Sequence, residues 1–164
     1  MSCVEDLLKR RSIRHYKDEP VPQSVLDKIL EAGRQAPSAV NRQPWHFILI
    51  QDQIVKEKII HPRYSRFLKD AAFAIVGVCF LDDPVTQRWA VVDTTIALQN
   101  MVNAAWLMGV GSCWIGGFRA EKIKEILDIP EEGRVVAIIS FGIPDEAPVR
   151  TKKPLKDILH HNKW

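Results

Sequence analysis

Four cations and one hydroxyl lie within six residues near the amino terminus, in the segment Lys9-Arg10-Arg11-Ser12-Ile13-Arg14. Guanidinium groups donate paired, coplanar hydrogen bonds that match the oxygens of a phosphate, and a serine hydroxyl can rotate to meet another oxygen. The segment therefore favours an anionic, phosphate-bearing ligand. The alternative is a solvated basic end of a helix, where positive charge is also favourable. Because short basic runs are common, these six residues alone do not decide between the two.

Three further patterns point to the same ligand. A second basic cluster, Arg150-Thr151-Lys152-Lys153, lies at the other end of the chain, and between the two clusters lie the loop 37–45 and the glycine pair Gly116-Gly117. The loop offers hydroxyl and amide groups that can hydrogen-bond the edge of a heteroaromatic ring, and paired glycines let a planar ligand lie against the backbone. The loop and the glycine pair can each also be a simple turn. Taken together, a phosphate site and a site for a hydrogen-bonding ring describe a flavin mononucleotide.

Other kinds of active site have no signature in the chain. There is no HExxH, EF-hand loop or cysteine–histidine cluster, and no GxSxG or Walker motif. Gly109-x-Gly111 follows a predicted helix instead of a strand, which is the wrong context for a dinucleotide fingerprint. An enzyme with this sequence is therefore expected to take its chemistry from an organic cofactor.

The elements that must position these residues follow from the hydrophobic pattern. Helices are predicted over 2–11 (with a Ser2–Glu5 capping box), 22–36, 53–60, 89–108, 120–128 and from 155 onward, and strands over 46–51, 73–80, 113–118 and 134–141. The helix over 89–108 is apolar on most of its circumference, yet Asp93 and several other polar residues argue against a membrane span. Such a helix lies either deep in a core or between two subunits, and we favour a dimer interface.

Length and composition indicate the number of domains, the kind of partner and the compartment of the protein. A chain of 164 residues that is 46% hydrophobic and 26% charged predicts one globular domain over 1–164. The net charge of +3 is small and the basic residues alternate with acidic ones, so nucleic-acid binding is not indicated. Cys79 and Cys113 lie in apolar surroundings, no CxxC is present, and the amino terminus does not resemble a signal peptide. We therefore expect a cytoplasmic protein.

Four motifs in this order resemble the nitroreductase family of flavin-dependent oxidoreductases. They are R-R-S-x-R, P-S-x-x-N-x-Q-P-W, G-x-G-S-C-W-I-G-G and R-x-K-x-P, and together they span residues 10–154. The resemblance implies an α+β fold in which helices flank a central, mostly antiparallel sheet. It also implies an intertwined homodimer with two FMN sites at the subunit interface.

The resemblance also implies roles for individual residues at the phosphate end. Arg10, Arg11 and Ser12 are expected to contact the phosphate and ribityl oxygens, and Arg14 the N1 and O2 edge of the flavin. Contacts from the second basic cluster are expected to return to the phosphate, through Arg150 and Lys152.

At the ring end, Pro37 and Ser38 resemble residues that reach the flavin from the partner subunit, and Asn41 and Gln43 belong to the same loop. The stretch that resembles residues flanking the ring near N5 consists of Trp114, Ile115, Gly116 and Gly117. The segment 64–70 shows no match to the asparagine that often contacts flavin in the family, and the chain is short, so the segments that cover the substrate in larger members are expected to be reduced.

The activity implied by the resemblance is ping-pong hydride transfer. NADH or NADPH reduces the flavin at N5, and a small aromatic acceptor, a nitroaromatic or a quinone, then takes two electrons. Two alternatives keep the cofactor: a non-catalytic FMN-binding or storage module, and an FMN-dependent reductive dehalogenase. A small basic domain that binds RNA is a further alternative.

Overall fold

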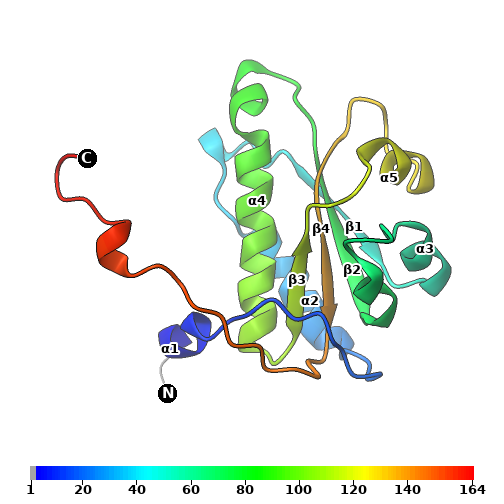
Figure 1. Cartoon of the computed structure of the whole chain (residues 1–164). Coiled ribbons are helices and arrows are strands. Elements are labelled where there is room, and N and C mark those ends of the chain that lie inside the picture. The colour runs from blue at the N-terminus through cyan, green and yellow to red at the C-terminus, as the bar shows by residue number, and fades with distance from the viewer. Residues whose placement is uncertain (1–2) are drawn as a thin grey trace.

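The computed structural model describes residues 3–164, in which four strands form one sheet in the order β1-β2-β4-β3 (Figure 1). The strands are β1 (Trp45–Ile50), β2 (Phe73–Cys79), β3 (Gly111–Ile115) and β4 (Arg134–Gly142). All three pairings between neighbouring strands are antiparallel. The predicted α+β fold around a mostly antiparallel sheet is therefore confirmed.

Helices cover both faces of the sheet. On one face, α4 (Pro84–Leu107) lies along the strands with α2 (Gln23–Arg34) packed against it, as Figure 1 shows. The other face packs against α3 (Gln53–Lys58), a 3₁₀ turn over Arg66–Asp70, and α5 (Ala120–Ile126). Alternate residues of β2 enter the two cores: Ile75 packs on the α4 side and Val76 on the α5 side. The continuous apolar run of this strand follows from burial on both faces.

The long helix α4 begins five residues earlier than the predicted start at Trp89. Asp83 caps it, because its carboxylate accepts hydrogen bonds from the backbone N–H groups of Val85 (2.8 Å) and Thr86 (2.9 Å). Pro84 then occupies the first helical position, where its missing N–H has no consequence. The sequence prediction placed the start too late because it relied on apolar periodicity, whereas the cap determines the start.

The two chain ends differ from the prediction. The first helix, α1 (Cys3–Leu8), ends before Arg11, so Lys9 lies in the turn that follows the helix and the rest of the basic segment lies outside any helix. The predicted capping residue Ser2 lies outside the described residues. The expected carboxy-terminal helix is only a 3₁₀ turn over Leu155–Asp157, and Figure 1 shows this end of the chain reaching away from the sheet. Of the helices in residues 3–164, none combines the length and apolar character that a membrane span requires.

Candidate functional site

The two basic clusters meet in space. Six predicted residues line one hollow of about 330 Å³, which we call the basic hollow: Arg10, Arg11, Ser12, Arg14, Arg150 and Lys152. The first four come from the segment that follows α1, and the last two from the chain that follows β4. Nearly the whole sequence separates the two groups, so their convergence is a property of the fold.

Backbone hydrogen bonds hold the amino-terminal segment between β3 and the chain after β4. The N–H of Ile13 donates to the carbonyl of Ser112 at 2.9 Å, and the N–H of Asp145 donates to the carbonyl of His15 at 3.0 Å. The carboxylate of Glu146 accepts the N–H of His15 at 3.1 Å. Because the segment is tied on both sides, the side chains that alternate along it are fixed relative to β3 and to the second basic cluster.

Buried neutral groups lie beneath this segment. The hydroxyl of Tyr16 lies 2.7 Å from the carbonyl of Ile13 and 2.7 Å from Oγ of Ser140, and burial raises the pKa of this phenol above its ordinary value. Burial also raises the pKa of the Cys113 thiol, although the positive charge of Arg14 opposes this shift. Both groups therefore stay uncharged near neutral pH and leave the charge of the hollow positive.

Among the described residues, the cations of the basic hollow have no ion-pair partner. The Arg11 guanidinium donates to the carbonyls of Leu8 (3.1 Å) and Arg10 (2.9 Å), which satisfies the end of α1 and leaves further donors. A concave surface of one charge raises the local concentration of anions. The hollow therefore has the charge and the donors that a phosphate requires.

The loop 37–43, which the sequence predicts to bind the ring, is anchored to α4. Both carboxylate oxygens of Asp93, which is only 4% exposed, accept the N–H of Ala39 at 3.2 Å. The hydroxyl of Ser38 accepts the N–H of Gln43 at 2.9 Å. These bonds fix the path of the loop, while Pro37 and Gln43 stay exposed.

Three residues of this loop have left-handed backbone conformations: Val40 (φ 51°), Asn41 (φ 56°) and Gln43 (φ 51°). Asparagine tolerates this conformation, but a β-branched residue such as Val40 does so only when its surroundings hold it there. The exposed Asn41 accepts the side-chain amide of Gln43 on its carbonyl at 3.2 Å. The loop is therefore a rigid, outward-facing turn.

One chain does not bring the loop and the basic hollow together. Arg42 pairs with Asp83 at the start of α4 (3.2 Å), whereas near the other end of α4 the indole of Trp106 donates to the carbonyl of Asp6 in α1 (2.8 Å). At about 1.5 Å per residue the two contacts are about 35 Å apart. Figure 1 shows α1 beside the carboxyl end of α4. The predicted site residues thus form two separate groups.

The stretch after β3 contributes backbone more than side chains. Trp114 turns to α4, where its indole N–H donates to Oε1 of Gln99 at 3.0 Å, and Ile115 is buried in the core on the opposite face. Gly116 is exposed, and a Cβ added there would meet no atom within 4 Å. A Cβ on Gly117 would lie 2.6 Å from Cδ2 of Tyr64. Open backbone is therefore presented at Gly116.

Sequence reasoning missed three residues that shape these groups. Asp93 was used only as evidence against a membrane span, although a carboxylate within an apolar helix was a signal for a buried acceptor. Glu146 lies in a segment without a pattern. Tyr64 covers Gly117 and stacks on His61 with ring centroids 4.7 Å apart. Nothing in the sequence pairs residues 64 and 117.

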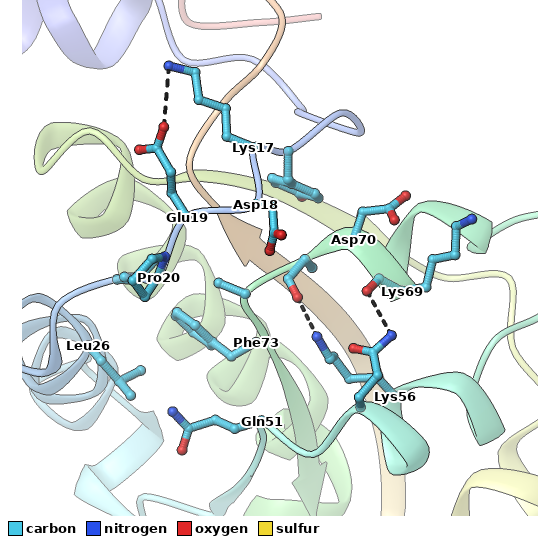
Figure 2. A pocket seen from close by; sticks show the side chains of 15 residues that line it. Lys17, Asp18, Glu19, Pro20, Leu26, Gln51, Lys56, Lys69, Asp70 and Phe73 are labelled. Carbon is cyan, nitrogen blue, oxygen red and sulfur yellow. Dashed lines mark hydrogen bonds and ion pairs between the residues drawn. The ribbon is translucent and has the colours of Figure 1, made fainter.

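A cavity of about 650 Å³ between the start of α2 and the start of β2 contains none of the predicted site residues (Figure 2). Three lysines and three acidic residues line it: Lys17, Lys56, Lys69, Asp18, Glu19 and Asp70. The buried amine of Lys56 donates to the carbonyl of Ala71, as a dashed line in Figure 2 marks. Because its opposite charges balance, this cavity has no net attraction for a phosphate.

Comparison with known proteins identifies relatives along nearly the whole chain. The model of a family described as the nitroreductase family matches residues 7–71 and 57–143. A protein of Methanothermobacter thermautotrophicus, provisionally named NADH dehydrogenase/NAD(P)H nitroreductase, is 38% identical over 170 residues, covering 100% of this chain and 88% of the relative. A solved structure described as an FMN-dependent nitroreductase from Clostridium difficile has a TM-score of 0.88 and 31% identity, covering 98% of this chain and 99% of that one.

Proposed function

This chain belongs to the nitroreductase family, and from that premise we propose that it is an NAD(P)H-dependent flavin oxidoreductase that holds FMN in the basic hollow. The observation that carries the proposal is the meeting of cations from both ends of the chain around one hollow. Arginine forks and a serine hydroxyl are suited to a phosphate. The relative whose description names FMN covers nearly the same length as this chain, which supports the same cofactor here.

In this proposal Arg10, Arg11 and Ser12 hold the phosphate and ribityl oxygens together with Arg150 and Lys152. The exposed backbone at Gly116, next to the half-buried Gly117, flanks the ring. The side chains of Trp114 and Ile115 point into the two cores, so we assign them backbone contacts only. This arrangement keeps all the predicted residues of the basic hollow and of β3 on one protomer.

The loop 37–43 then belongs to the site of a second copy. Within one chain it lies near the far end of α4 from the basic hollow, and it presents Pro37, Asn41 and Gln43 outward, with the half-buried Ser38 among them. The outward face of α4 carries exposed Trp89 and Val92, 41% and 45% exposed, which a partner subunit would cover. We therefore propose a homodimer in which each FMN lies at the interface and the partner supplies this loop.

When bound, FMN supplies hydride acceptance and donation at N5, which allows NAD(P)H and an oxidised aromatic acceptor, a nitroaromatic or a quinone, to react in turn. The protein positions the ring and stabilises charge. Arg14, exposed beside the ring of Phe67 at 6.0 Å, supplies positive charge for the N1 and O2 edge. Losing one such fixed donor raises the activation free energy by roughly 3–4 kcal/mol. The variant Arg14→Ala is therefore expected to retain FMN, while its flavin is reduced slowly.

The free, buried thiols of Cys79 and Cys113 suit a reducing compartment. We therefore propose a cytoplasmic enzyme.

The test is the visible spectrum of the purified, FMN-saturated protein before and after anaerobic addition of NADH or NADPH. Retention of the flavin bands through gel filtration and their loss with the nucleotide are expected, followed by their return with nitrofurazone or menadione. Flavin bands that persist with both nucleotides would instead indicate a storage module. Return of the bands with a halotyrosine alone would indicate a dehalogenase, and a colourless protein would refute the cofactor. The mass on the same column tests the dimer.

A further inference from the structure

A second hollow, of about 190 Å³, lies beside the glycine pair between the end of α3 and the start of α5. Figure 1 shows these two helices on the same side of the sheet. Its floor is apolar, formed by Ile59, Phe118 and Ile123, and its rim carries His61, Arg119 and Lys122. We call it the α3–α5 hollow. An apolar floor with a cationic rim fits a flat base that carries a phosphate.

The two permanent cations of the rim have no side-chain partner among the described residues. Arg119 and Lys122 are exposed, and neither side chain forms an ion pair or hydrogen bond with any residue in 3–164. The nearest acid in sequence, Glu121, is turned to Lys124 at 4.0 Å, and both line a different hollow. No carboxylate therefore neutralises the rim, and both cations remain available to an anion.

The α3–α5 hollow adjoins the position proposed for the flavin ring. Phe118, in its floor, directly follows Gly117 in the chain. Tyr64, which lies against Gly117, stacks on His61 of the rim at 4.7 Å between ring centroids. The hollow is therefore a neighbouring surface on which the adenosine half of a dinucleotide can lie while its nicotinamide gives hydride over the glycine pair.

We infer that the α3–α5 hollow receives the adenosine end of NADPH, with Arg119 and Lys122 holding the 2′-phosphate. Sites for NADH generally place a carboxylate on the ribose 2′-hydroxyl, whereas sites for NADPH place a cation near the 2′-phosphate. The lining of this hollow contains two permanent cations and no carboxylate. The protein therefore prefers NADPH to NADH. This inference rests on the proposed function, because it assumes hydride transfer at the glycine pair.

The binding test uses FMN-saturated protein, so that the basic hollow is filled. Calorimetric titration compares adenosine 2′,5′-bisphosphate with adenosine 5′-monophosphate, which lacks the 2′-phosphate. The bisphosphate is expected to bind at least about tenfold more tightly, and Arg119→Gln or Lys122→Gln each to raise its Kd about tenfold. Lys28→Gln removes a cation of α2 that is also exposed and is expected to change nothing. Equal binding of the two nucleotides, or unchanged affinity in both variants, overturns the inference.

A kinetic test separates this inference from the proposed function. The same variants are reduced anaerobically with NADPH, NADH and 1-benzyl-1,4-dihydronicotinamide, which has no adenosine. The KM for NADPH is expected to rise about tenfold in each variant, while reduction by the benzyl donor is unchanged. If no donor reduces the flavin, the proposed function fails. If the benzyl donor reduces it and parent and variants use NADPH and NADH alike, only the inference about the α3–α5 hollow fails.

Discussion

Replacing one arginine from each end of the chain tests whether both ends hold a single phosphate. A hydrogen bond to a charged group contributes about 1.5–3 kcal/mol, and 1.4 kcal/mol is tenfold in Kd. Arg10 is half-buried, so Arg10→Gln is expected to weaken FMN binding about 10- to 100-fold. Arg150 is exposed, so Arg150→Gln lies near the lower limit, about tenfold. Because both contacts share one ligand, their effects on the free energy of binding are not expected to add.

The assay compares FMN with riboflavin, which has the same ring and ribityl chain but no phosphate. Quenching of flavin fluorescence gives the Kd of each ligand for the parent, the two single variants and the double variant, with Lys28→Gln as the matched surface control. The variants are expected to lose affinity for FMN and to keep their affinity for riboflavin. Salt is expected to weaken FMN binding more than riboflavin binding, because screening acts on charges.

Two results would refute the reasoning. Equal losses for FMN and riboflavin would mean that the arginines shape the site without contacting the phosphate. A loss in Arg10→Gln with none in Arg150→Gln would mean that the convergence of the two chain ends has no role in binding. Melting temperatures of the variants without flavin show whether either change disturbs the fold.

Three further predictions concern stability and the loop. Gly33→Ala places a Cβ 2.1 Å from Cε of Met101, so urea denaturation is expected to show a loss of about 1–3 kcal/mol that is less than additive with Met101→Ala; additive losses would contradict this. Asp93→Ala leaves the N–H of Ala39 without its acceptor and is expected to reduce stability by about 1–3 kcal/mol and to weaken FMN binding, whereas Asp93→Asn keeps an acceptor; parent-like stability of the alanine variant would contradict this. Burial lowers the pKa of Lys56 below its ordinary 10.5, so the folded protein releases this proton first and the free energy of unfolding is expected to rise with pH between the lowered pKa and 10.5, a rise that Lys56→Met removes; parallel pH curves would contradict it.

Much of the fold follows from hydrophobic pattern and turn chemistry. The strands β2 and β4 were predicted to within a residue at each end, because continuous apolar runs bounded by polar residues or turns are a strong local signal. The start of α3 at Gln53 was predicted as well, and the carboxylate of Asp52 caps it by accepting the N–H of Val55 at 2.9 Å. The ends of the chain were predicted less well, because a basic extended segment and a helix end have the same composition.

The candidate site, too, was predicted in part. The cations of the basic hollow were singled out by their side-chain chemistry, and the fold brings them together. The contact between Tyr64 and Gly117 and the anchoring of Ala39 by Asp93 are long-range, and no local pattern predicts which residues will meet. The distance between the loop 37–43 and the basic hollow follows from the length of α4, whose first turn the sequence prediction missed. Only the fold shows that the loop 37–43 and the basic hollow lie at opposite ends of α4.

Pairwise electrostatics would not predict that two basic clusters meet, because like charges repel. The segment is held instead by two neutral contacts, the Ile13–Ser112 hydrogen bond and the buried hydroxyl of Tyr16, and by the carboxylate of Glu146, which accepts the backbone N–H of Arg14. The fold therefore holds the cations together against their repulsion. Arrangements that are locally unfavourable, such as like charges placed side by side, are typical of functional sites. An anion in the basic hollow relieves the repulsion, so the same residues that make the empty site unfavourable make the binding of a phosphate favourable.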